Sequence, residues 1–167
     1  MVVPLIYDEL GFYSVHYDRL MAVKDGKYGS IDFADNTVLS FVYDTLHYRI
    51  NDDWAFCTDG KWGLVAPGDK IIIPAEYDGI GEFKGDYDAD NNFKGYGLAS
   101  VKRDGKWGFV NKENELVVPF KYDNVEQDMF GVTYEGEVAF VTRDGLLFWI
   151  DKDGKENPHG DHVHFEN

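Results

Sequence analysis

Acidic side chains alternate along residues 85–90 of the chain, which run Gly-Asp-Tyr-Asp-Ala-Asp. Such alternation is typical of the start of a calcium-binding loop, where oxygens at the first, third and fifth positions converge on the cation. The pattern then fails, because Asn91 stands where such loops require glycine and Gly97 where they require a bidentate glutamate. We therefore expect no metal here, and we interpret the segment as an acidic-aromatic tip that attracts a basic protein. The residues of this tip are Asp86, Tyr87, Asp88 and Asp90.

Two other groups of polar side chains invite a chemical interpretation. Asp52 and Asp53 form a second acidic pair, for which we predict the same role of steering a basic partner. Three histidines near the end of the sequence have a spacing that could bind zinc or nickel. On an unstructured terminus such binding is usually adventitious, so we expect no metal site there. These histidines are His159, His162 and His164.

Catalysis finds little support in the sequence. Carboxylates abound, but no spacing singles out an acid and a base. There is no glycine-rich phosphate loop and no strand-turn-helix pattern that would display a nucleophile. Cys57 ends the apolar run Trp54-Ala55-Phe56-Cys57, so we expect a buried structural thiol. We thus predict a protein that is not an enzyme, with no catalytic residue and no cofactor.

The elements that must position these residues are tandem repeats. The phrase Asp-Gly-Lys-Trp-Gly occurs at residues 59–63 and 104–108, with related phrases at 25–29 and 144–148. A second phrase recurs beside each copy of the first. It consists of an aliphatic pair followed by Pro and then Tyr-Asp, and one copy has Ser40 in place of Pro. Its Tyr-Asp pairs are Tyr7-Asp8, Tyr43-Asp44, Tyr77-Asp78 and Tyr122-Asp123. The period of about 35–45 residues lies in the range of repeat arrays.

Each residue type in these phrases has an expected structural role. Asp-Gly between β-forming runs predicts a two-residue hairpin, because a type I′ turn requires positive φ at both central positions. The glycine after Trp is expected to let an indole from a neighbouring strand or unit lie close, and the Trp to pack in the core or between units. In the Tyr-Asp pair, Asp is expected to accept backbone N–H groups while the Tyr hydroxyl stays at the rim. These structural positions are Asp25, Asp59, Asp104 and Asp144 in the turns, and Tyr28, Trp62, Gly63, Trp107 and Gly108 beside them.

The two phrases resemble those of the WG-repeat family, bacterial proteins whose units carry an aliphatic pair with Pro, a Tyr-Asp and a closing Asp-Gly-Lys-Trp-Gly. The resemblance covers residues 1–151. Tyr28 takes the Trp position in the first repeat, and Leu147 and Phe148 replace Trp and Gly in the fourth. The resemblance implies an all-β array used mainly for binding, and it carries over no catalytic residue.

From these observations we predict an all-β fold, a tandem array of about four three-stranded antiparallel meanders in which a loop follows each meander. The repeats span residues 1–32, 33–67, 68–111 and 112–151, and residues 152–167 form a polar C-terminal cap or tail. We favour an open twisted stack. The alternative is a small closed barrel or propeller-like ring, in which the strand at Val2-Val3-Pro4 would fill the place beside the last hairpin.

Charge and hydropathy limit the kinds of partner and the location that we expect for this protein. The net charge is −15, from 31 acidic and 16 basic residues, which disfavours nucleic acid and anionic membranes as partners. No signal peptide or membrane span is evident, so we expect a cytoplasmic protein. Our main hypothesis is a non-catalytic module that binds another, basic protein, in its sharpest form an immunity or inhibitor protein. The alternative is a module that binds glycans or cell walls through exposed aromatic rings.

Overall fold

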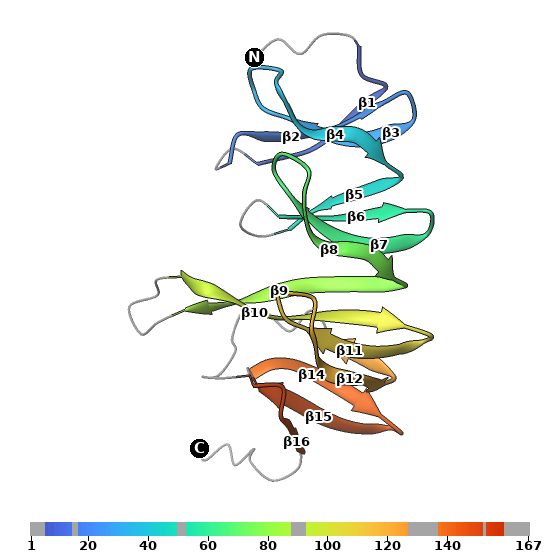
Figure 1. Ribbon diagram of the computed structural model, residues 1–167, viewed down its shortest axis with the longest axis vertical. Helices are drawn as coiled ribbons and strands as arrows, with labels where there is room; N and C mark the ends of the chain where they lie inside the picture. Colours follow the sequence, from blue (N-terminus) through green and yellow to red (C-terminus); the bar gives the residue numbers. More distant parts are fainter. Residues whose placement is uncertain are drawn as a thin grey trace, which may run out of the picture. The chain divides into compact units, whose positions relative to one another are not determined.

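The computed structural model describes residues 6–14, 17–49, 53–87, 93–126, 137–151 and 153–158. The chain divides into two compact units, Met1–Tyr77 and Asp78–Asn167. Each unit contains two four-stranded sheets, and the described ranges contain no helix (Figure 1). The predicted all-β fold of tandem antiparallel repeats is therefore confirmed.

Unit 1 holds sheets 1 and 2, and neighbouring strands in each are consecutive in the chain and antiparallel. Sheet 1 consists of β1 (Glu9–Ser14), β2 (Arg19–Lys24), β3 (Lys27–Ile31) and β4 (Thr37–Tyr43). Sheet 2 consists of β5 (Thr45–Tyr48), β6 (Trp54–Thr58), β7 (Lys61–Ala66) and β8 (Lys70–Tyr77).

Unit 2 holds sheets 3 and 4, which repeat the same antiparallel meander. Sheet 3 consists of β9 (Gly79–Tyr87), β10 (Phe93–Arg103), β11 (Lys106–Val110) and β12 (Leu116–Tyr122). Sheet 4 consists of β13 (Asn124–Glu126), β14 (Glu137–Arg143), β15 (Leu146–Asp151) and β16 (Glu156–Pro158).

Each sheet has one strand more than predicted. The segment after a Tyr-Asp pair, which we expected to be a loop, forms the first strand of a sheet (β1, β5, β9 or β13). These strands bury aliphatic side chains, since Leu46 is 1% and Ile80 7% exposed. Two of them are so short that alternation of polar and apolar residues cannot show in the sequence. The sheets therefore begin just after Asp8, Asp44, Asp78 and Asp123. The predicted repeats began at residues 1, 33, 68 and 112, about ten residues before each sheet begins.

The Asp-Gly turns have the predicted conformation. The φ angles of Asp25, Asp59, Asp104 and Asp144 are 52°, 52°, 51° and 53°, and those of the following glycines are 73°, 74°, 79° and 77°. Both central positions thus have the positive φ of a type I′ turn. In the fourth repeat, where Leu147 and Phe148 replace Trp and Gly, Arg143 still pairs with Leu146 across this turn.

The glycine after Trp makes room for a backbone and not for an indole, which corrects our expectation. A Cβ on Gly63 would lie 2.4 Å from the carbonyl oxygen of Ile73, and one on Gly108 would lie 2.6 Å from that of Val118. Opposite each glycine the fourth strand bulges, so that Trp62 to Leu64 faces residues 73–77. Such a bulge brings the backbone of the fourth strand over the glycine.

A separate apolar core lies within each unit. In unit 1, side chains of sheets 1 and 2 pack together around Trp54, which is fully buried, and Tyr28 packs against this core. In unit 2, side chains of sheets 3 and 4 pack together around Phe109 and Tyr122, and Trp107 packs against them. Cys57 is buried, as predicted. Packing between successive sheets therefore stabilises the repeats within each unit.

None of the four sheets closes into a barrel. β16 pairs with β15 from Ile150 to Phe148, so the place beside the last hairpin is filled by the polar C-terminal segment. The ring alternative gave that place to Val2-Val3-Pro4, which lies outside the described residues.

Candidate functional site

Each Tyr-Asp pair directly precedes a sheet, and its Asp bonds to that sheet; we call this arrangement the clamp. In unit 1, the Asp44 carboxylate Oδ2 accepts the N–H of Asp59 at 2.8 Å, and the Asp44 N–H donates to the carbonyl of Cys57 at 2.9 Å. In unit 2, Asp123 bonds in the same way to the N–H of Asp144 and the carbonyl of Thr142. Asp78 makes the corresponding pair of bonds with Asp104 and Lys102, whereas Asp8 accepts the N–H of Gly26, one residue later in its turn. The prediction that this Asp accepts backbone N–H groups is thus confirmed.

Two lysines of the Asp-Gly-Lys phrase complete the clamp. Lys27 binds the second oxygen of Asp44, and Lys106 binds that of Asp123. The clamp carboxylate therefore joins the hairpin turns of two successive sheets. The hydrogen bond from lysine and that from the backbone hold the pKa of Asp44 and Asp123 below the usual value. Both pairs are exposed to solvent, so their contribution to stability is small.

In three clamps, those of Tyr7, Tyr43 and Tyr122, the tyrosine donates its hydroxyl to a carboxylate of the next sheet. Tyr7 donates to Asp35 at 2.6 Å and Tyr43 to Asp69 at 2.8 Å. Both acceptors lie in the turn between the third and fourth strands, where their φ angles are 70° and 57°. Burial and the neighbouring carboxylate raise the pKa of Tyr7 to about 12 and raise that of Tyr43.

Ser40 shows how the clamp adapts where proline is missing. Its N–H, which proline would lack, donates to Asp69 at 3.0 Å, and its hydroxyl donates to the same carboxylate. Burial acts to raise the pKa of Asp69, but the hydrogen bonds from Ser40 and Tyr43 outweigh it and lower the pKa. Ser40 adds a backbone N–H to this edge strand that proline would not have, and Asp69 accepts its hydrogen bond.

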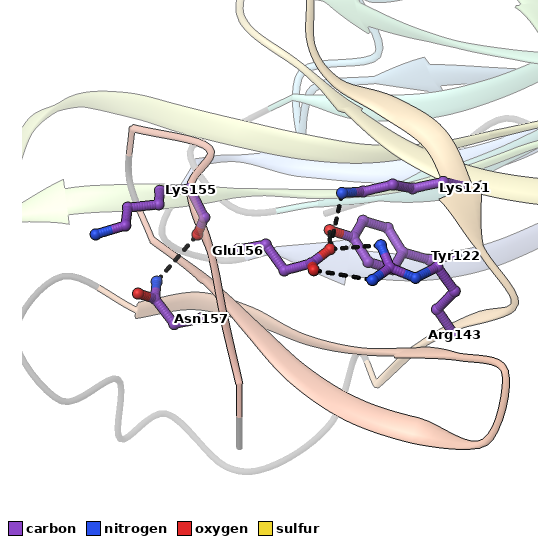
Figure 2. A network of polar contacts seen from close by, with 6 residues as sticks. All are labelled: Lys121, Tyr122, Arg143, Lys155, Glu156 and Asn157. Carbon is purple, nitrogen blue, oxygen red and sulfur yellow. Dashed lines mark hydrogen bonds and ion pairs between the residues drawn. The ribbon is translucent and has the colours of Figure 1, made fainter. Parts of the chain in front are cut away.

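In sheet 4 the carboxylate comes from the fourth strand itself (Figure 2). Glu156 accepts the hydroxyl of Tyr122 at 2.6 Å and two guanidinium N–H groups of Arg143 at 2.8 and 3.0 Å. Lys121 Nζ lies 2.8 Å from the same carboxylate. Burial opposes ionisation, yet these donors lower the pKa of Glu156 to about 2. Sequence reasoning missed this network and placed Glu156 only within the polar C-terminal cap or tail of residues 152–167.

The predicted partner-binding residues have different outcomes. Asp86 and Tyr87 lie at the end of β9, where only the backbone is described. Asp53 is only 7% exposed, and so differs from the prediction that it lies at an exposed tip. Several other candidates lie outside the described residues, namely Asp52, Asp88, Asp90, His159, His162 and His164.

Exposed carboxylates recur at the Asp-Gly hairpin turns of all four sheets. Asp25, Asp59, Asp104 and Asp144 are all exposed, and the turns lie on one side of each unit (Figure 1). Lys27 also interacts with Asp59, and Lys106 with Asp144. Each of these lysines therefore lies between two carboxylates, which leaves a net negative charge at the turn.

Aromatic side chains of the repeat phrase offer little free surface. Trp62 is half-buried and stacks on His47 with 5.5 Å between ring centroids. Trp107 is also half-buried, with Lys102 Nζ 5.7 Å from its ring centroid. In both cases a neighbouring side chain covers part of the indole.

The described ranges contain no group of three His, Cys, Asp or Glu side chains placed to hold a metal ion. They also contain no helix that is long and apolar enough to cross a membrane.

Comparison with known proteins gives one family match. The family described as WG containing repeat matches residues 62–107 and again 107–146, together just over half of the chain. The first matched segment runs from Trp62 to Trp107, the two tryptophans of the repeated phrase. No curated protein matches the chain.

Proposed function

Because the chain belongs to the family of WG containing repeat proteins, we propose that it is a non-catalytic repeat module that binds another protein, and that this partner is basic. The single observation that carries the proposal is the repeated acidic turn. A fixed backbone presents one exposed aspartate at the same position of every sheet.

Rigid presentation of these carboxylates favours recognition. The turn aspartates have closely similar φ angles, and the N–H of three of them is bonded to a clamp carboxylate. This surface would therefore lose little conformational entropy when a partner binds. Charges in such an arrangement increase the rate of association with a partner of opposite charge.

Lysines of the chain itself support a cationic ligand for this surface. Lys27 and Lys106 already bind clamp carboxylates at the turns, so an ammonium group fits there. In the fourth repeat Leu146 stands in the lysine position and is 63% exposed. There a lysine or arginine of a partner would meet the exposed carboxylate of Asp144.

The biological form of this binding that we favour is inhibition. A chain of 167 residues with a net charge of −15 suits a protein that covers the cationic surface of a toxin or nuclease. Binding of this kind depends on long-range charge and so weakens as salt rises.

Replacing Asp25, Asp59, Asp104 and Asp144 together by Asn tests the proposal. Asn tolerates positive φ, so the turns should keep their conformation while they lose four charges. We expect the affinity for the protein that co-purifies with the chain from its own cell to fall at least tenfold. Titration calorimetry at two salt concentrations measures this, and the wild-type affinity should fall as salt rises.

The matched control also removes four charges, but away from the hairpin turns. Glu9, Glu113 and Glu115 become Gln and Asp153 becomes Asn, all at exposed positions. We expect a change of less than threefold. Equal losses in both variants, an acidic partner, or affinity that ignores salt would contradict the proposal. Binding to a glycan in place of a protein would favour the alternative function.

A further inference from the structure

The fourth strand of sheet 4 is held differently from its counterparts. β4, β8 and β12 have 7, 8 and 7 residues, and each ends in the tyrosine of a clamp. β16 has 3 residues and pairs with β15 at three positions, Glu156 with Ile150, Asn157 with Trp149, and Pro158 with Phe148. Over these three described positions the ladder offers few backbone hydrogen bonds, and side chains add to the attachment of the strand.

The main side-chain attachment is a carboxylate in a cradle of three donors. Lys121 and Tyr122 come from β12 and Arg143 from β14, while the carboxylate comes from β16 (Figure 2). Arg143 binds both oxygens, the bidentate geometry that selects a carboxylate. Its guanidinium carbon also lies 4.8 Å from the ring centroid of Phe148 and 5.8 Å from that of Tyr122, which orients the cradle.

In sheet 4 the edge strand and the clamp depend on each other. In sheets 1 and 2 the acceptors of the clamp tyrosines, Asp35 and Asp69, lie in the turn that precedes the fourth strand. In sheet 4 that turn has Gly154 at positive φ, and the acceptor is Glu156 on the strand. If β16 leaves β15, all three donors of the cradle are released at once.

We propose that β16 is an exchangeable strand, and that the edge of β15 together with the cradle of Lys121, Tyr122 and Arg143 binds an extended peptide of a partner that carries a carboxylate at the register of Glu156. Strand addition at a sheet edge uses backbone hydrogen bonds for affinity and side-chain sites for specificity. The cradle supplies that specificity, because a carboxylate satisfies all of its donors. The cradle is partly open to solvent, since the side chains of Arg143 and Glu156 are 30% and 23% exposed.

This site is separate from the acidic turns. It takes an acidic strand, whereas the turns are proposed to take a basic surface. Failure of either proposal would therefore leave the other standing.

A fluorescently labelled peptide with the sequence of residues 153–158 tests the exchange on the full chain. We expect Glu156→Gln, which weakens the internal strand and leaves the cradle charged, to bind this peptide at least tenfold more tightly than the wild type does. A peptide with Gln in place of its Glu should lose at least tenfold of that affinity. Glu113→Gln, a matched change at an exposed position, should behave as the wild type.

Fluorescence anisotropy separates the outcomes. Equal binding of both peptides, or no binding to the Glu156→Gln chain, would overturn the proposal. The Glu156→Gln chain could instead form dimers that exclude the peptide. That result would assign the strand site to a second copy of the chain and would also overturn the proposal.

Hydrogen exchange of the wild type keeps the proposal testable if the variant does not fold. The amides of β16 should exchange at least tenfold faster than those of β14 and β15, since the strand opens locally. Equal exchange in all three strands would mean that β16 leaves only on global unfolding, and would refute exchange.

Discussion

Replacing Gly108 by alanine is expected to lower the free energy of unfolding by about 2–3 kcal/mol, as overpacking of a tight site does. The added methyl group would lie 2.6 Å from the carbonyl oxygen of Val118 and 3.1 Å from the N of Phe120. These are backbone atoms of the bulged strand β12, so no side-chain rotation can relieve the contact. Chemical denaturation followed by circular dichroism measures the change.

Gly79 offers a matched control in the same unit. Its added methyl group would meet Lys102 and Trp107 at 3.5 Å, an ordinary van der Waals contact. We expect Gly79→Ala to be neutral, or to stabilise by up to about 1 kcal/mol through the unfolded state. If the two substitutions had the same effect, close approach of the fourth strand would not explain the glycine of the repeated phrase.

The second large effect concerns Trp54. It is fully buried in the core between sheets 1 and 2, where its ring meets that of Tyr48 edge-on at 5.0 Å between centroids. We expect Trp54→Ala to destabilise by about 3–5 kcal/mol, because removal of a buried indole leaves a large cavity. Thermal and denaturant unfolding of the full chain both report this loss.

Trp62→Ala provides the comparison within the same unit. Trp62 is half-buried, so its removal should cost clearly less than that of Trp54. A greater loss at Trp62 would mean that the indole of the repeated phrase, and not Trp54, is the main packing residue between these sheets.

These residues also show what the sequence could predict. Asp59-Gly60 favours a type I′ turn, because Asp and Gly both tolerate positive φ, and the hairpins followed from that local preference. The regular spacing of the phrases indicated four similar units, and the family match agrees with it. Local conformational constraints and internal repetition are properties that a single sequence carries directly.

Contacts between distant segments were harder to predict. The predicted role of Gly63 was wrong in detail, because the approach of the Ile73 carbonyl depends on a bulge in another strand. The extra strands β5 and β13 were missed because 4 and 3 residues give no measurable alternation. Glu156 was not recognised, since its partners come from strands 13 or more positions away.

The clamp explains why Tyr and Asp occur together. The Asp44 carboxylate accepts the N–H of Asp59 in the turn between the second and third strands of the following sheet. The Tyr43 hydroxyl donates to Asp69 in the turn between the third and fourth strands. The Tyr43-Asp44 dipeptide therefore holds both turns of sheet 2. The sequence predicted the local role of the Asp but could not show that its bonds cross to the next sheet.

Each clamp aspartate holds the hairpin turn of the following sheet, and amide hydrogen exchange in two reciprocal variants can show this. In Asp123→Ala the amide of Asp144 should exchange about tenfold faster, the effect of losing about 1.4 kcal/mol of protection, while that of Asp59 stays unchanged. In Asp44→Ala the amide of Asp59 should respond and that of Asp144 should not. Equal acceleration of both amides in either variant, or none, would contradict the account.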